Sequence, residues 1–67
     1  MSKKKGALVR PQEGSRVHHR SNPNSVGTVT RIGSEGDWMR VEWDEGANYK
    51  ERRSIINYWS ELAVVDG

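Results

Sequence analysis

Seven cationic side chains and one tryptophan carry the strongest chemical signal in this chain of 67 residues. Lysine and arginine neutralise phosphate groups, so such a set predicts contact with nucleic acid and an affinity that falls as the salt concentration rises. An indole ring beside guanidinium groups can stack on a base and orient it. The predicted nucleic-acid-binding residues are Lys3, Lys4, Lys5, Arg10, Arg16, Arg31, Trp38 and Arg40.

The charges are distributed unevenly along the chain. Residues 1–20 hold six Lys and Arg against one Glu, a net charge of +5, whereas residues 32–51 hold two cations against six carboxylates, a net charge of −4. The basic half favours a polyanionic partner, DNA or RNA, and the acidic half argues against nucleic acid wrapping the whole molecule. The alternative for the lysine run is a solubilising tail.

A second basic group lies at Lys50, Arg52 and Arg53. These side chains could extend a phosphate-binding edge. The alternative is that they are solvated and pair with Glu45 or Glu51, in which case they contribute little.

The aromatic residues of the second half of the chain support an alternative function. A shallow aromatic groove would make the protein an interaction adaptor for a peptide or a partner domain, as would strand addition at an open sheet edge. The alternative is that one of these rings packs into the core and another covers it. For Trp38, the alternative to ligand stacking is that it closes one end of the fold over residues 33–37. The residues of the predicted peptide groove are Tyr49, Tyr58 and Trp59.

Catalysis and metal binding find no support in the residue pattern. Neighbouring residues on a strand point to opposite faces, so His18 and His19 cannot share a metal ion, and the chain has no cysteine. Glu42 and Asp44 share a face without a nucleophile beside them, and we expect Asp44 to cap its own turn. We therefore expect no enzymatic activity, no metal site and no cofactor.

The elements that must position these side chains are short strands joined by polar turns. Alternation and β-branched residues predict strands at 14–20, 26–32, 38–43, 47 to about 50, and 62–65. Residues 1–12 are expected to form a flexible, disordered basic tail, and residues 13–67 the folded domain. The remaining segments are predicted to be loops at 21–25 and 33–37, irregular structure at 51–57 and a single 3₁₀ turn at 58–61.

The strand at 38–43 shows the clearest alternation. Met39, Val41 and Trp43 share the inward face, while Trp38 and its alternate neighbours face outward. Because no helix is available to cover a sheet, the strands must bury their faces against each other in a small, bent, five-stranded all-β barrel. The predicted core is Val17, Val26, Val29, Ile32, Met39, Val41, Trp43, Tyr49, Ile55, Leu62 and Val64.

Five motifs lie along the predicted strands and turns: Gly14-x-Arg16-Val17, Val26-Gly27-Thr28-Val29-x-x-Ile32, Val41-x-Trp43-Asp44-x-Gly46, Tyr49-Lys50 and Leu62-x-Val64-Val65. This pattern resembles the SH3-like barrels. Within that group it is most similar to the Mind bomb-type domain of ubiquitin ligases, and more distantly to the KOW and Tudor modules. The resemblance spans about residues 14–65 and implies an SH3-like barrel fold; we infer no ubiquitin chemistry from it.

The absence of cysteine favours a reducing compartment, and the cytoplasm is the expected location. The longest apolar run, Leu62-Ala63-Val64-Val65, is far too short to cross a membrane. Together the observations predict a small, basic, non-enzymatic binding module that is a monomer or weak oligomer. It is expected to contact nucleic acid with little sequence selectivity.

Overall fold

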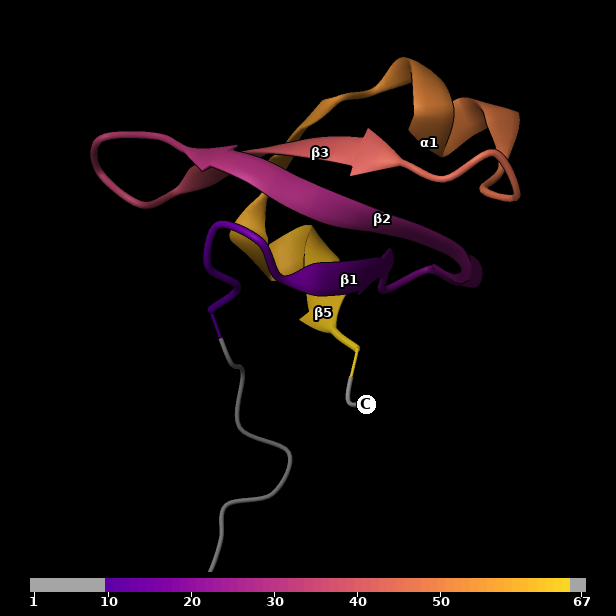
Figure 1. Cartoon of the computed structure of the whole chain (residues 1–67), viewed down its shortest axis with the longest axis horizontal. Coiled ribbons are helices and arrows are strands. Elements are labelled where there is room, and N and C mark those ends of the chain that lie inside the picture. The colour runs from indigo at the N-terminus through magenta and orange to yellow at the C-terminus, as the bar shows by residue number, and fades with distance from the viewer. Residues whose placement is uncertain (1–9, 66–67) are drawn as a thin grey trace, which may run out of the picture.

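The computed structural model describes residues 10–65, which form one antiparallel sheet of five strands. The strand order is β4-β3-β2-β1-β5, so β4 and β5 are the edges, and the sheet curls into a half-barrel (Figure 1). This confirms the predicted all-β fold. The elements in chain order are β1 (Arg16–His19), β2 (Asn22–Ile32), β3 (Trp38–Trp43), α1 (Tyr49–Arg53), β4 (Ile56–Tyr58), η1 (Trp59–Glu61) and β5 (Leu62–Val64).

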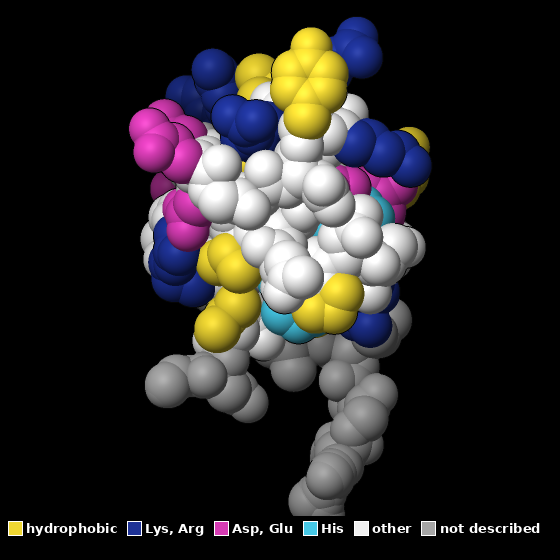
Figure 2. Space-filling view, turned by 90° about the vertical axis from the view of Figure 1, so that its right-hand side faces the viewer, with side chains coloured by type: hydrophobic (Ala, Val, Ile, Leu, Met, Phe, Trp, Pro, Cys, Tyr) yellow, Lys and Arg dark blue, Asp and Glu magenta, His cyan; other side chains and the backbone are white. Residues whose placement is uncertain are grey.

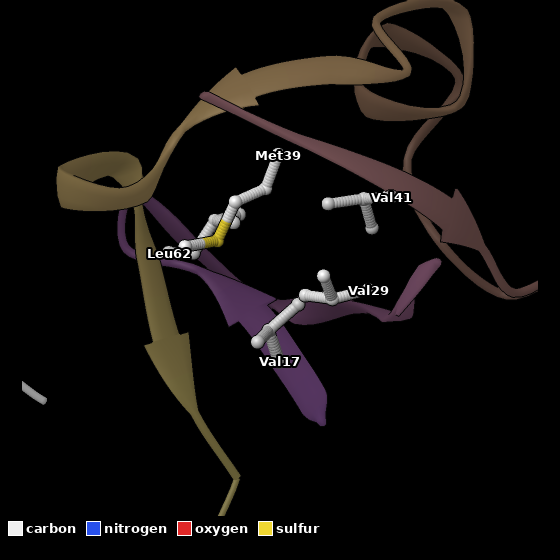
Figure 3. Close-up of a cluster of buried hydrophobic side chains, with 5 residues drawn as sticks. All are labelled: Val17, Val29, Met39, Val41 and Leu62. Atoms are coloured by element: carbon white, nitrogen blue, oxygen red, sulfur yellow. The ribbon is translucent and has the colours of Figure 1, made fainter. Parts of the chain in front are cut away.

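The core lies on the concave side of the sheet. Figure 3 shows its five side chains directed toward one another, and each is at most 1% exposed. Ile32, Trp43 and Trp59 are partly buried and pack against this cluster. The alternation predicted for β3 is confirmed, since Met39 and Val41 are buried while their neighbours are exposed. The five core residues are Val17, Val29, Met39, Val41 and Leu62.

Gly27 lets β2 approach β3 closely. A Cβ atom at this position would lie 2.8 Å from the carbonyl oxygen of Glu42 and 2.8 Å from Cγ1 of Val41. The missing side chain at Gly27 therefore permits this close backbone approach. The irregularity in the β2–β3 pairing lies further along, where the register shifts between Val29 and Arg31. Such a bulge bends the strand and re-aims the side chains that follow it.

The segment from residue 47 to 57 differs from the prediction. The expected fourth strand is wrong, because Tyr49–Arg53 forms the short helix α1 and the Tyr49 side chain is 67% exposed instead of buried in the core. Ile55, also expected in the core, is exposed. The edge strand β4 forms at Ile56–Tyr58, inside and just beyond the segment expected to be irregular. The reason is that Asn22 and Ser25 of β2 donate hydrogen bonds to the carboxylate of Glu51 and so draw this part of the chain inward.

The loop expected at 21–25 is also wrong, because β2 begins at Asn22, whose Cα partner is His19. By contrast, the 3₁₀ turn is confirmed at Trp59–Glu61. The loop between β2 and β3 is confirmed at 33–37.

The N-terminal end of the described chain contacts the sheet. Pro11 is buried, and the backbone N–H of Gly14 donates a 2.7 Å hydrogen bond to the carbonyl of Val29 in β2. Lys3, Lys4 and Lys5, which the sequence assigns to the nucleic-acid contact, lie outside the described residues. Within residues 10–65, no helix is long and apolar enough to traverse a bilayer.

Candidate nucleic-acid interface

Two rows of cross-strand partners cover the convex face of β2, β3 and β4. In the first row, Arg31 is opposite Arg40 and Arg40 is opposite Ile56. In the second row, Trp38 is opposite Tyr58. Directly opposite residues of an antiparallel pair project to the same face, and all five of these side chains are exposed. The register therefore gathers two arginines and two aromatic rings on one surface, which we call the Arg/Trp face.

The hydrogen bonds between β3 and β4 show how closely these side chains are paired. The N–H of Val41 donates to the carbonyl of Ile55 at 2.7 Å, and the N–H of Trp59 donates to the carbonyl of Asp37 at 3.0 Å. Hydrogen-bonded and non-hydrogen-bonded pairs alternate, so the pairs at Arg40 and at Trp38 are non-hydrogen-bonded. Side chains of such pairs lie closest together. The backbone polar groups of their β4 partners consequently point away from β3, toward the open edge.

The indole of Trp38 rests on Gly33. A Cβ atom at Gly33 would overlap Cε2, Nε1 and Cδ2 of the indole, so only glycine leaves room for the ring. Trp38 remains 39% exposed. It thus projects outward from β3, as expected, and also leans back over the start of the 33–37 loop. Its partner Tyr58, assigned from the sequence to a peptide groove, lies on the Arg/Trp face instead.

Arg16 has a carboxylate partner. Its Nη1 and Nη2 atoms donate to Oδ1 and Oδ2 of Asp44 at 3.0 and 2.6 Å, and Nη1 also donates to the hydroxyl of Thr28 at 2.9 Å. The Arg16 hydrogen bonds hold the pKa of Asp44 below its usual range. Contrary to expectation, the Asp44 side chain binds an arginine, and only its backbone carbonyl serves the turn, accepting from the N–H of Ala47. The charge of Arg16 is thereby largely compensated.

Arg10 also has a partner within the fold. Its guanidinium carbon lies 4.6 Å from the ring centroid of Trp59, and its Nη1 atom lies 3.5 Å from the carbonyl oxygen of Gly36. Trp59 also packs against the core. The Trp59 ring therefore contacts both the core and Arg10. The other two rings of the predicted peptide groove have different neighbours: Tyr49 lies beside arginines of α1, and Tyr58 lies on the Arg/Trp face.

Basic and aromatic side chains cluster on α1, where the sequence predicted the basic group but not its contact with Tyr49. The guanidinium carbons of Arg52 and Arg53 lie 5.9 and 5.6 Å from the ring centroid of Tyr49. An open hollow of about 380 Å³ is lined by Tyr49, Lys50, Arg53 and Ser54. Figure 2 shows hydrophobic and basic side chains gathered at the top of the molecule, where α1 lies. The sequence signal was the three cations at positions 50, 52 and 53, which by themselves predict neither the helix nor the hollow.

Glu51 points in the opposite direction from its basic neighbours. Its carboxylate is 3% exposed and accepts hydrogen bonds from the Ser25 hydroxyl at 2.8 Å and from Nδ2 of Asn22 at 3.2 and 3.3 Å. Burial opposes ionisation, but these hydrogen bonds and the nearby His19 together hold the pKa of Glu51 below its usual range. The Ser25 hydroxyl is fully buried and in turn accepts from the N–H of Asn48 at 2.9 Å. The network thus joins β2 to α1 and offers no accessible nucleophile.

Two further findings concern metal binding and similarity to known proteins. Across residues 10–65, no three His, Cys, Asp or Glu side chains are grouped so that they could hold a metal ion. The chain matches no known family model, no curated protein and no solved structure. The resemblance to SH3-like and Mind bomb-type domains therefore stays a prediction.

Proposed function

We propose that this protein is a non-enzymatic, cytoplasmic module that binds nucleic acid through the Arg/Trp face with little sequence selectivity. The observation that supports this most is the Arg31–Arg40 cross-strand pair beside Trp38. Among residues 10–65, Arg16 and Asp44 form the only ion pair with nitrogen and oxygen atoms within 4.0 Å of each other. Within these residues, therefore, no carboxylate pairs with Arg31 or Arg40. Two adjacent uncompensated guanidinium groups favour an anion as their ligand.

The roles of the side chains follow from their chemistry. Arg31 and Arg40 contact backbone phosphates, which fixes the strand without reading its sequence. The exposed rings of Trp38 and Tyr58 stack on bases, and stacking tolerates any base because each has a π face. An unpaired strand presents its bases for stacking, so we expect single-stranded nucleic acid to bind more tightly than duplex.

The lysines at the N-terminus add long-range attraction in this proposal. Residues 10–65 contain eight Lys and Arg and eight Asp and Glu, so they carry no net charge. The net charge of +2 comes from Lys3, Lys4 and Lys5 against Asp66. Binding should therefore combine a general attraction from the lysines with local contacts from the Arg/Trp face.

The proposal is tested by titrating labelled single-stranded and duplex oligonucleotides at two salt concentrations. We expect the Arg31→Gln/Arg40→Gln variant to bind more weakly, with a salt slope smaller by about 1.4 for a single strand because two phosphate contacts are lost. The Arg31→Lys/Arg40→Lys variant keeps both charges and serves as the matched control. Wild-type protein that shows no salt-sensitive binding at roughly tens of micromolar would refute the proposal.

A specific observation also favours protein interaction as a second candidate function. The backbone polar groups of Ile56 and Tyr58 face the open edge of the sheet, and their side chains are 52% and 64% exposed. Such an edge can accept an added strand from an extended peptide. Chemical-shift mapping separates the two functions: nucleic acid shifts the signals of Arg31 and Arg40 together with that of Tyr58, whereas an added peptide strand shifts the amides of β4 without the side-chain signals of Arg31.

A further inference from the structure

We infer that the hollow beside α1 is a second phosphate-binding site. On the function proposed above, it holds a phosphate group further along the strand that occupies the Arg/Trp face. Its lining supplies an ammonium group from Lys50, a guanidinium group from Arg53 and the hydroxyl of Ser54. All three groups donate hydrogen bonds to phosphate oxygens, and two of them carry a full positive charge.

The cations of α1 are available because their acidic neighbour has been removed from the surface. Glu51 is the carboxylate within the helix, and it is buried against Ser25 and Asn22. A helix whose sequence contains charges of both signs therefore presents only positive charge to solvent. Its exposed charged side chains are Lys50, Arg52 and Arg53.

Tyr49 restricts the motion of the arginines. With both guanidinium carbons within 6 Å of the Tyr49 ring, Arg52 and Arg53 are held by cation–π attraction. An arginine that is already ordered loses less rotamer entropy when it binds an anion. The hollow is thus a preorganised cationic site and not a set of freely moving surface charges.

The position of α1 allows one strand to occupy both sites. Arg53 precedes Ile56 by three residues, a separation of at most about 10 Å along the chain. Ile56 is the cross-strand partner of Arg40. Arg53, which lines the hollow, is therefore only a short distance along the chain from the cross-strand partner of Arg40.

The first experiment isolates the site by titrating inorganic phosphate and adenosine 5′-monophosphate while recording amide NMR spectra. We expect saturable shifts at residues 50–54 in wild-type protein and in Arg31→Gln/Arg40→Gln, but not in Lys50→Gln/Arg53→Gln. These two variants lose the same charge at different places, so each is the matched control of the other. Shifts no larger than those caused by chloride at equal ionic strength would overturn the inference.

The second experiment distinguishes this inference from the proposed function. With a single-stranded oligonucleotide, Lys50→Gln/Arg53→Gln should reduce the salt slope by about 1.4. Unchanged oligonucleotide binding in this variant would overturn the second site and leave the proposed function standing. Phosphate shifts at 50–54 without any oligonucleotide binding would support the phosphate site and refute the proposed function.

Discussion

The hydroxyl of Ser25 donates a 2.8 Å hydrogen bond to the carboxylate of Glu51, and both groups are buried. The two residues are 26 positions apart, so the contact fixes α1 against β2. Replacing Glu51 with Gln removes the charge and places an amide NH₂ group among donors. We expect a loss of about 1–3 kcal/mol in the free energy of unfolding, measured by chemical denaturation. An unchanged free energy of unfolding would contradict the structural role given to Glu51.

The same carboxylate makes stability depend on pH. Because the pKa of Glu51 is lower in the folded state than its unfolded value of about 4.3, the unfolded chain binds more protons as the pH falls. Its contribution is fully present above the unfolded pKa and is lost as the pH falls through the folded pKa. Denaturation between pH 7 and about pH 3 should therefore show a smaller acid-induced loss in Glu51→Gln than in wild type. Asp44, whose pKa is also lowered, contributes with the same sign in both proteins.

Gly33 supports the indole of Trp38. The Gly33→Ala variant should displace the ring, because the new methyl group overlaps it. We expect a shift of the Trp38 indole N–H signal and weaker oligonucleotide binding, with the fold retained. Gly46→Ala is the matched control: a Cβ there meets nothing within 4 Å and its φ is not positive, so its effect should stay within about 0.5 kcal/mol. Identical Trp38 signals in Gly33→Ala and wild type would disprove this packing.

Leu62 connects the last strand to the core. It is fully buried, so Leu62→Ala should lower the free energy of unfolding by about 2–5 kcal/mol and leave a domain of this size largely unfolded. Val65→Ala removes a similar apolar group at an exposed position just after β5 and should change stability little. Thermal unfolding followed by circular dichroism measures both. Equal melting temperatures for the two variants would be incompatible with the core described here.

Arg10 covers Trp59. The Arg10→Gln variant loses the cation–π contact, which is worth about 0.5–1 kcal/mol at an exposed site. We expect the Trp59 indole to become more accessible to a fluorescence quencher. The Lys50→Gln variant removes an exposed positive charge on α1, a different element from the one that holds Trp59, and it should leave quenching unchanged. If both variants respond alike, the effect reflects net charge and not the contact.

Several elements could be predicted because their causes are local. The alternation of Trp38-Met39-Arg40-Val41-Glu42-Trp43 specifies a strand with two different faces wherever it is placed. The β-branched run from Val26 to Ile32 likewise favours extended backbone. In both cases the hydropathy of neighbouring residues was sufficient.

The errors have non-local causes. Tyr49 was expected in the core because an aromatic residue after a turn is typical of a buried strand, but its segment became a helix with Glu51 buried in its place. Asp44 was expected to cap its own turn, but its side chain binds Arg16, 28 positions away. Neither partner could be identified from the residues that flank it.

The sequence by itself determined that this chain forms short strands with one apolar face, since that depends on the steric period of extended backbone. Only the tertiary structure decided which charges remain at the surface. The fold brought Asp44 to Arg16, Ser25 to Glu51 and Arg40 to Arg31. As a result, the charge of Arg16 is compensated and the carboxylate of Glu51 is buried. Arg31 and Arg40 remain together at the surface. Electrostatic interactions depend on distance in space, which the order of residues does not contain.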